Sequence, residues 1–162
     1  MAIPLRRSAP DQIRNASRTF FITTKTTMGK ALLQTDRNAA LLVDVLRRCV
    51  AAKHFILHDF VIMPNHVHLL IELGPDISVE KAMQYIKGGY SFRLKNENGY
   101  PGEIWQRGFS EVRILDRMSF RRHKEYIAQN PVKAGLARTA EEFKWSYTYL
   151  AAHKAGAKAQ PC

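Results

Sequence analysis

Two histidines, His66 and His68, stand two positions apart in the segment Met63-Pro64-Asn65-His66-Val67-His68-Leu69-Leu70. In a β-strand, alternate side chains project from the same face, with Cα atoms about 6.6 Å apart at roughly 3.3 Å per residue. Two imidazoles in this arrangement can bind one metal ion, and His is the commonest protein ligand for metals. Partly buried histidines that serve only packing give the same pattern, so the pair alone leaves both interpretations open.

Tyr126 and Asn130 are four positions apart in a stretch with helical periodicity, so they lie on one face of a predicted helix. The same stretch carries Arg121, Arg122 and Lys124, whose side chains can donate charge-assisted hydrogen bonds to phosphates. A tyrosine hydroxyl has a pKa of about 10 in water and becomes a nucleophile for phosphodiester cleavage once a metal or base activates it. Amphipathic packing is the alternative role for a tyrosine at this position.

The charge of the chain favours a polyanionic partner. The 162 residues include 25 Lys and Arg against 14 Asp and Glu, for a formal net charge of +11. This excess indicates nucleic acid first and an anionic membrane surface second, and a basic protein without a specific partner is the alternative.

Cysteines and apolar segments exclude several classes of protein. Cys49 and Cys162 are the only cysteines, which excludes a disulfide framework and a Cys-based metal site. The N-terminal segment 1–14 has no apolar core of signal-peptide length, and no apolar run approaches the length of a membrane span. We therefore expect a cytoplasmic protein with no membrane partner.

Strand and helix patterns place the candidate side chains in one predicted domain. The patterns predict four strands, at about 18–26, 55–62, 66–73 and 104–115, and four helices, at about 36–53, 79–95, 118–130 and 140–152. Pro64 and Asn65 supply turn residues between the second and third strands, which are therefore expected to form a β-hairpin. The order strand, helix, strand, strand, helix, strand matches a ferredoxin-like β-α-β-β-α-β sheet. We therefore expect an α+β fold with helices mainly on one face of the sheet, plus C-terminal helices.

Individual residues mark the expected boundaries. Asp36 and Ser78 are the expected N-caps of the first two helices, and Pro131 is expected to end the third helix. Gly108 is expected to interrupt the fourth strand. The domain plan is a basic N-terminal arm over 1–17, a single catalytic domain over 18–153 and a flexible tail over 154–162.

Further cations extend the predicted phosphate-binding surface. Lys87 and Arg93 lie on the basic side of the second helix, and Arg107 lies near the start of the fourth strand. Together with the cluster 121–124 they are expected to bind the DNA backbone, with an affinity that falls steeply as salt is added.

Three aromatic residues and one carboxylate have two interpretations each. Tyr90, Trp105 and Phe109 can stack on unpaired bases, although packing in the core is the alternative. Asp59 lies on the strand next to the histidine pair and can orient one imidazole as a hydrogen-bond acceptor. A surface carboxylate without a role is the alternative for Asp59.

Four segments of the chain resemble REP-associated tyrosine transposases and the small single-strand transposases of bacterial insertion sequences. These families belong to the histidine-hydrophobic-histidine class of nucleases. The resembling segments are Phe20-Phe21-Ile22-Thr23, His58 to Leu70 with its Met-Pro-Asn-His-Val-His motif, Trp105-Gln106-Arg107-Gly108-Phe109, and Tyr126 to Leu136 with its Tyr-Ile-Ala-Gln-Asn-Pro motif. The two motifs are specific in this order and spacing, and the resemblance spans about Thr19 to Tyr147.

The resemblance implies roles for individual residues. His66 and His68 would be ligands of a divalent metal, and Tyr126 would be the nucleophile. The insertion-sequence relatives use a Gln four residues after the tyrosine as the third protein ligand, and Asn130, which is one methylene shorter, stands at that position here. After Phe109, the sequence Ser-Glu-Val-Arg replaces the aspartate-histidine continuation that we expect in the family.

The implied activity is that of a metal-dependent DNA transposase or endonuclease. It would cut and rejoin single-stranded DNA near hairpins through a 5′-phosphotyrosine intermediate, with Mg²⁺ or Mn²⁺ as the metal. Neutral imidazoles are required, so we expect activity to fall below about pH 6.5. The alternative is a non-cleaving, domesticated binder of structured single-stranded DNA or RNA. The insertion-sequence relatives act as dimers, so a homodimer is also open.

Overall fold

The computed structural model describes residues 17–158, with side chains placed for residues 17–153. All of the predicted N-terminal arm except its last residue, and the final residues 159–162, lie outside the described part. The elements are β1 (Arg18–Lys25), η1 (Thr27–Gly29), α3 (Asp36–Ala51), β2 (Ile56–Met63), β3 (His66–Leu73), α4 (Val79–Asn98), β4 (Ser110–Ile114), α5 (Arg117–Lys133), η2 (Ala140–Glu142) and α6 (Tyr147–Lys158).

The four strands form one antiparallel sheet in the order β2-β3-β1-β4. In the β1-α3-β2 unit, the two strands have β3 between them in the sheet. In the β3-α4-β4 unit, the two strands have β1 between them. This interleaving confirms the ferredoxin-like β-α-β-β-α-β arrangement. The hairpin of β2 and β3, predicted from Pro64 and Asn65, is also confirmed.

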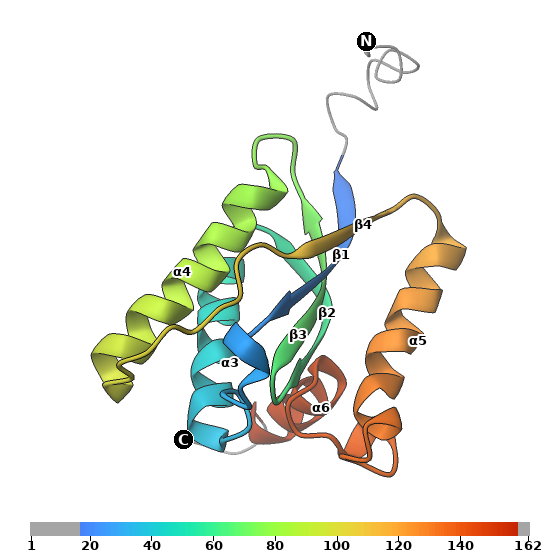
Figure 1. Ribbon diagram of the computed structural model, residues 1–162. Helices are drawn as coiled ribbons and strands as arrows, with labels where there is room; N and C mark the ends of the chain where they lie inside the picture. Colours follow the sequence, from blue (N-terminus) through green and yellow to red (C-terminus); the bar gives the residue numbers. More distant parts are fainter. Residues whose placement is uncertain (1–16, 159–162) are drawn as a thin grey trace.

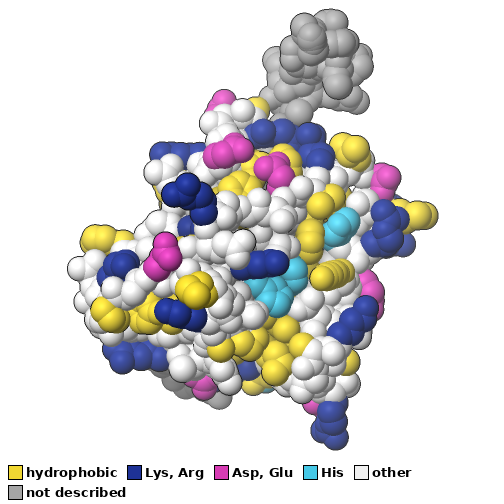
Figure 2. All heavy atoms as spheres, viewed as in Figure 1, with side chains coloured by type: hydrophobic (Ala, Val, Ile, Leu, Met, Phe, Trp, Pro, Cys, Tyr) yellow, Lys and Arg dark blue, Asp and Glu magenta, His cyan; other side chains and the backbone are white. Residues whose placement is uncertain are grey.

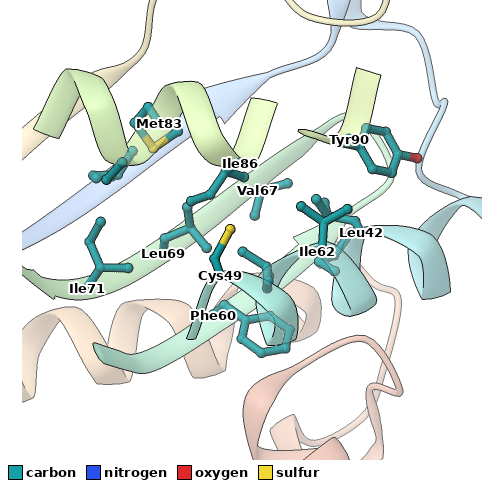
Figure 3. Close-up of a cluster of buried hydrophobic side chains, with 14 of the residues drawn as sticks. Leu42, Cys49, Phe60, Ile62, Val67, Leu69, Ile71, Met83, Ile86 and Tyr90 are labelled. Atoms are coloured by element: carbon teal, nitrogen blue, oxygen red, sulfur yellow. The ribbon is translucent and has the colours of Figure 1, made fainter. Parts of the chain in front are cut away.

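Helices α3 and α4 cover one face of the sheet, and α5 covers the other (Figure 1). The main core lies between the sheet and α3 and α4. Figure 3 shows Met83 and Ile86 of α4 above Val67 and Leu69 of β3. Alternate residues of β3 therefore face the main core, which leaves His66 and His68 on the face that α5 covers.

The face under α5 has a much smaller apolar core. Its buried members are Val61, Met63, Leu70, Ile114 and Ile127. Beside this cluster, at the ends of β3 and β1 nearest the β2-β3 turn, the same face carries the polar residues of the candidate site. Val61 and Met63 of β2 lie directly opposite His68 and His66 in the sheet.

Two helix boundaries differ from their expected positions. The first helix is capped by Thr35, whose side chain accepts a hydrogen bond from the Asn38 backbone N–H, and not by Asp36. Ser78 caps α4 as expected. The expected stop at Pro131 is wrong, because α5 continues to Lys133. The ring of Pro131 is buried and the carbonyls of Asn130 and Pro131 accept backbone bonds from the following turn, so the helix tolerates the missing N–H.

The predicted strand over 104–115 is interrupted where expected. Gly108 has a φ of 81°, which glycine adopts without steric cost, and only Ser110–Ile114 pairs with β1 as a strand. Trp105 forms an isolated bridge with Thr26, and the Gln106 backbone N–H donates to the Lys25 carbonyl. The segment before β4 is therefore attached to the end of β1.

The predicted helix over 140–152 is divided into two. The turn η2 and the helix α6 are separated by a segment that binds the sheet, since the Ile62 N–H donates to the Trp145 carbonyl and Val61 bridges Ser146. Helix α6 extends to Lys158 and so includes residues 154–158 of the expected flexible tail. Within residues 17–158, no helix has both the length and the apolar content to cross a bilayer.

Candidate active site

The two histidines of β3 lie on one face of the sheet, as predicted. Their ring centroids are 4.8 Å apart, with an angle of 75° between the ring planes. In the sheet register, His66 lies opposite Lys25 and His68 lies opposite Thr23 of β1. These four side chains therefore share a face near the β2-β3 turn.

His68 is buried and held from one side only. Its Nδ1 lies 2.8 Å from the Thr23 hydroxyl oxygen, whereas its Nε2 is buried and has no hydrogen-bond partner among the described residues. Burial, followed by the charges of His66 and Lys25, lowers the pKa of His68 from 6.5 to about 4. The ring is therefore neutral at physiological pH and offers one nitrogen to the cavity.

His66 is partly exposed and has two amide neighbours. Its Nδ1 lies 2.8 Å from the Asn65 side-chain oxygen, and the Asn130 side chain of α5 lies near the ring, close enough to influence its pKa. Burial lowers the pKa of His66, the Lys25 charge adds to this effect, and Asn130 opposes it. Asn130 thus reaches the histidine pair despite its shorter side chain.

Tyr126 meets the histidine pair from α5. Its ring stands edge-on to His68, with a centroid distance of 5.1 Å and an interplanar angle of 88°. Phe21 of β1 contacts both rings, at 5.3 Å from His68 and 5.7 Å from Tyr126. Tyr126 nevertheless remains 46% exposed, so the residue can be reached from solvent.

These residues line one cavity of about 590 Å³, which Tyr126, His66, His68 and Thr23 share with Gln106 and Ser110. Histidine side chains gather at the centre of the face shown in Figure 2, with a basic side chain directly beside them. The structure therefore places His66, His68 and Tyr126, three of the residues assigned to catalysis and metal binding, on one cavity. The fourth, Asn130, does not line the cavity but lies near His66.

The donor set at this cavity fits a divalent metal. The described part of the chain has no cluster of three or more His, Cys, Asp and Glu side chains. The candidate ligands are instead two imidazole nitrogens and the amide oxygen of Asn130, a set that suits Mn²⁺ and Mg²⁺ when phosphate oxygens and water complete the coordination. The unpartnered Nε2 of His68 is the structural sign of such a ligand, because buried polar atoms normally have a partner.

Three of the predicted DNA-binding cations have partners within the fold. Arg93 forms ion pairs with Asp44 of α3 and Glu97 of α4. The Lys87 ammonium donates to the carbonyls of Gln106 and Gly108, at 3.1 and 2.7 Å, and so holds the loop beside the cavity. Lys124 contacts Asp59, with 3.3 Å between the ammonium nitrogen and the carboxylate.

Arg107, Arg121 and Arg122 are exposed, as a role in DNA binding requires.

Neither interpretation of Asp59 holds, because its carboxylate is buried, pairs with Lys124 and accepts from the Phe60 N–H at 2.9 Å. Burial raises the pKa of Asp59, and the nearby Lys124 charge opposes this shift.

The three aromatic residues considered for base stacking belong to the main core or pack against it. Tyr90 is fully buried, and its hydroxyl donates to the Asn38 carbonyl at 3.0 Å. The indole N–H of Trp105 donates to the Lys87 carbonyl, and both Trp105 and Phe109 pack against the main core. Core packing, the alternative role, therefore describes these three residues.

Sequence reasoning missed three site residues on β1, namely Phe21, Thr23 and Lys25. They alternate along the strand, so they share one face. Alternation alone does not tell which face that is, because the pairing of β1 with β3 decides it. The available signal was the position of Thr23 at the end of the resembling segment 20–23.

Comparison with known sequences places the chain among transposases. Residues 21–130 match the family described as Transposase IS200 like. A Haemophilus influenzae protein classed as a candidate REP-associated tyrosine transposase is 33% identical over 95 residues, covering 52% of this chain and 54% of that protein. An uncharacterized H. influenzae protein is 29% identical over 97 residues, covering 46% of this chain and 53% of that protein. The chain thus spans about half the length of the curated relatives it matches.

Two solved structures share the fold. The structure of a REP-associated tyrosine transposase bound to a REP hairpin has a TM-score of 0.65 and 24% identity, covering 89% of this chain and 82% of that chain. A candidate transposase from Deinococcus radiodurans has a TM-score of 0.54 and 20% identity, covering 68% of this chain and 88% of that chain. The family match includes both histidines, Tyr126 and Asn130, and confirms the resemblance drawn from the two motifs. The chain therefore belongs to the IS200-like transposase family.

Proposed function

We propose that this protein is a metal-dependent transposase or endonuclease that cuts single-stranded DNA beside a hairpin and rejoins the ends. The observation that carries the proposal is the position of Tyr126, whose ring lies 5.1 Å from that of His68 at the wall of the cavity that both histidines line. A partly exposed tyrosine that lines the same cavity as two candidate metal ligands is suited to attack a phosphodiester bound there.

In the proposed step, the Tyr126 hydroxyl oxygen forms a bond to the phosphorus of the DNA backbone. The bond between phosphorus and the 3′-oxygen of the preceding nucleotide breaks at the same time. The hydroxyl proton is lost to solvent, and the leaving 3′-oxygen takes a proton from water. The products are a 5′-phosphotyrosine and a free 3′-hydroxyl, and attack of a 3′-hydroxyl on the phosphotyrosine rejoins DNA and releases Tyr126.

A divalent metal, Mg²⁺ or Mn²⁺, supplies charge withdrawal from the phosphate when it is bound. His68 would hold it through Nε2, His66 through its ring and Asn130 through its amide oxygen. The Thr23 hydroxyl fixes the orientation of the His68 ring, since it lies 2.8 Å from Nδ1. Phe21 excludes water from one side of the His68 and Tyr126 rings.

Two observations support structured DNA as the substrate. One protein with the same fold has been solved bound to a REP hairpin. The chain carries a net charge of +11, and exposed arginines lie on α5 and in the loop before β4. Single strands next to a hairpin give the tyrosine access to an unpaired phosphodiester, which a continuous duplex would hold in a fixed helical geometry.

The test is covalent capture of DNA by the full-length protein. The substrate is a labelled library of DNA hairpins with randomised single-stranded flanks, mixed with protein and Mn²⁺ and resolved on a denaturing gel. We expect an adduct that peptide mapping assigns to Tyr126, and its loss in Tyr126→Phe with binding retained. Tyr149→Phe is the matched control, because Tyr149 stacks on His153, outside the cavity.

Different outcomes separate this activity from its alternative. DNA attached to another tyrosine, or an adduct that persists in Tyr126→Phe, would contradict the proposed nucleophile. Cleavage that survives replacement of both His66 and His68 by Ala would contradict the metal ligands. Tight hairpin binding by the wild-type protein with no adduct would instead favour the non-cleaving binder.

A further inference from the structure

Lys25 is the only Lys or Arg side chain, among the described residues, that lines the active-site cavity. It lies directly opposite His66 in the sheet register, on the same face as both histidines. Its charge acts on both imidazoles and lowers the pKa of each. The cations that the sequence indicated do not line this cavity.

The backbone at Lys25 is fixed on both sides. The Lys25 carbonyl accepts the Gln106 N–H at 2.8 Å, and the next residue, Thr26, donates its N–H to the Asn65 carbonyl at 3.0 Å. The side chain itself is exposed and forms no ion pair with a carboxylate of residues 17–153. A fixed backbone therefore presents an unneutralised ammonium group to the cavity.

A lysine beside a metal site is unfavourable unless an anion lies between the two positive charges. A phosphodiester supplies such an anion, because its two non-bridging oxygens can face different cations. We propose that Lys25 is a phosphate-binding catalytic residue, whose ammonium group binds a non-bridging oxygen of the phosphodiester that Tyr126 attacks. This inference rests on the proposed function. It adds to the site a second positive charge, beside that of the metal, that binds the phosphate.

The charge on that oxygen grows as the tyrosine oxygen attacks, so the contact is stronger in the transition state than in the bound substrate. We therefore expect Lys25→Met to lower the single-turnover cleavage rate by about 100-fold. Lys25→Arg should recover part of the rate, because it keeps the charge. Lys30→Met is the matched control, because Lys30 is an exposed lysine near Lys25 that does not line the cavity.

A binding measurement tests the contact without cleavage. DNA binding by the Tyr126→Phe protein, with and without Lys25→Met, is measured by titration in EDTA. The DNA is the hairpin that the library experiment recovers as an adduct. If no adduct forms, a hairpin selected from the library by binding is used instead. Each phosphate of the single-stranded flank is replaced in turn by an uncharged methylphosphonate. At one phosphate, we expect Lys25→Met to weaken binding about tenfold when that phosphate is charged and to have almost no effect when it is neutral. The same phosphate should be the one that wild-type protein cuts.

If Lys25→Met and the methylphosphonate reduce the binding free energy independently at every phosphate, the inference is overturned. It is also overturned if their effects depend on each other at a phosphate other than the cleaved one. An equal loss of rate in Lys30→Met would also overturn it, since net charge would then explain the effect. Coupling at one phosphate in a protein that forms no adduct would overturn the proposed cleavage while upholding the contact. The two failures are therefore distinguishable.

Discussion

At the scale of single residues, the Thr23 hydroxyl contacts Nδ1 of His68, which leaves Nε2 without a partner among the described residues. When Nδ1–H donates to Thr23, the Nε2 lone pair is free for a metal. We predict that Thr23→Val, which removes the hydroxyl and keeps the shape, lowers Mn²⁺ affinity by about 10- to 100-fold in calorimetric titration. Thr24→Val is the control, because the buried Thr24 hydroxyl has no partner among residues 17–153 and alternates with Thr23 to the other side of the sheet. Equal affinity in both variants would show that Thr23 does not orient the ligand.

The titration of His68 gives a prediction for stability. Its pKa is lowered from 6.5 to about 4 in the folded protein. Between these values the unfolded chain binds a proton that the folded chain does not, so stability falls as pH falls through this range, by roughly 3 kcal/mol in total. Urea unfolding in EDTA at several pH values should show that the free energy of unfolding falls less at acid pH in His68→Asn than in wild type. Parallel pH dependences would contradict the burial of a neutral imidazole.

The same shift corrects the expected acid limit of metal binding. We expected activity to fall below about pH 6.5, the range of an ordinary histidine. Burial keeps His68 neutral to lower pH, and the pKa of His66 is lowered as well. Protons should therefore compete with the metal for the two imidazoles only at a lower pH than the ordinary pKa of histidine indicates.

At the scale of elements, the Lys124–Asp59 pair attaches α5 to β2. Removing Lys124 leaves a buried carboxylate without its partner, so we predict that Lys124→Met lowers the free energy of unfolding by about 2 kcal/mol. The Asp59→Asn/Lys124→Met double variant should recover most of this loss. Arg122→Ala, which removes an exposed cation two residues before Lys124 on α5, should weaken DNA binding without changing the urea midpoint. An unchanged midpoint in Lys124→Met would return Lys124 to the DNA-binding surface.

The elements themselves were largely predictable, because their signals are local. Aromatic and β-branched residues identified β1, the Pro64-Asn65 turn identified the hairpin of β2 and β3, and the order of elements indicated the ferredoxin-like topology. The end of α5 was not predictable from Pro131, because burial of the ring and the bonds of the next turn offset the helix-breaking tendency. Tertiary context decides such cases.

The candidate site was predictable only in part, for a related reason. His66, His68, Tyr126 and Asn130 each lie at a recognisable spacing within one element. Phe21, Thr23 and Lys25 join the site only because β1 pairs with β3, and this pairing joins segments more than 40 residues apart. In the same way, the partners of Arg93 lie on two helices, so its charge alone did not indicate that it is used within the fold.

At the scale of the whole molecule, the net charge of +11 overstates the surface available to DNA. Arg93, Lys87 and Lys124 are bound to carboxylates or carbonyls of the fold. Exposed cations remain on α5 and in the loop before β4, and Lys25 lines the cavity itself. Only cations that exchange counterions for phosphates contribute to the salt dependence of binding.

This difference gives a prediction for hairpin affinity as a function of salt. If Arg107, Arg121, Arg122 and Lys25 each bind one phosphate of a single-stranded flank, the slope of log K against log salt is about −3. Arg121→Ala/Arg122→Ala should make the slope less negative by about 1.4. Arg93→Ala should leave the slope unchanged, because its guanidinium already pairs with Asp44 and Glu97. The measurement is fluorescence anisotropy with Tyr126→Phe protein in EDTA, with circular dichroism to confirm that each variant is folded. A slope that changes equally in both variants would show that total charge, and not the exposed surface beside the cavity, governs binding.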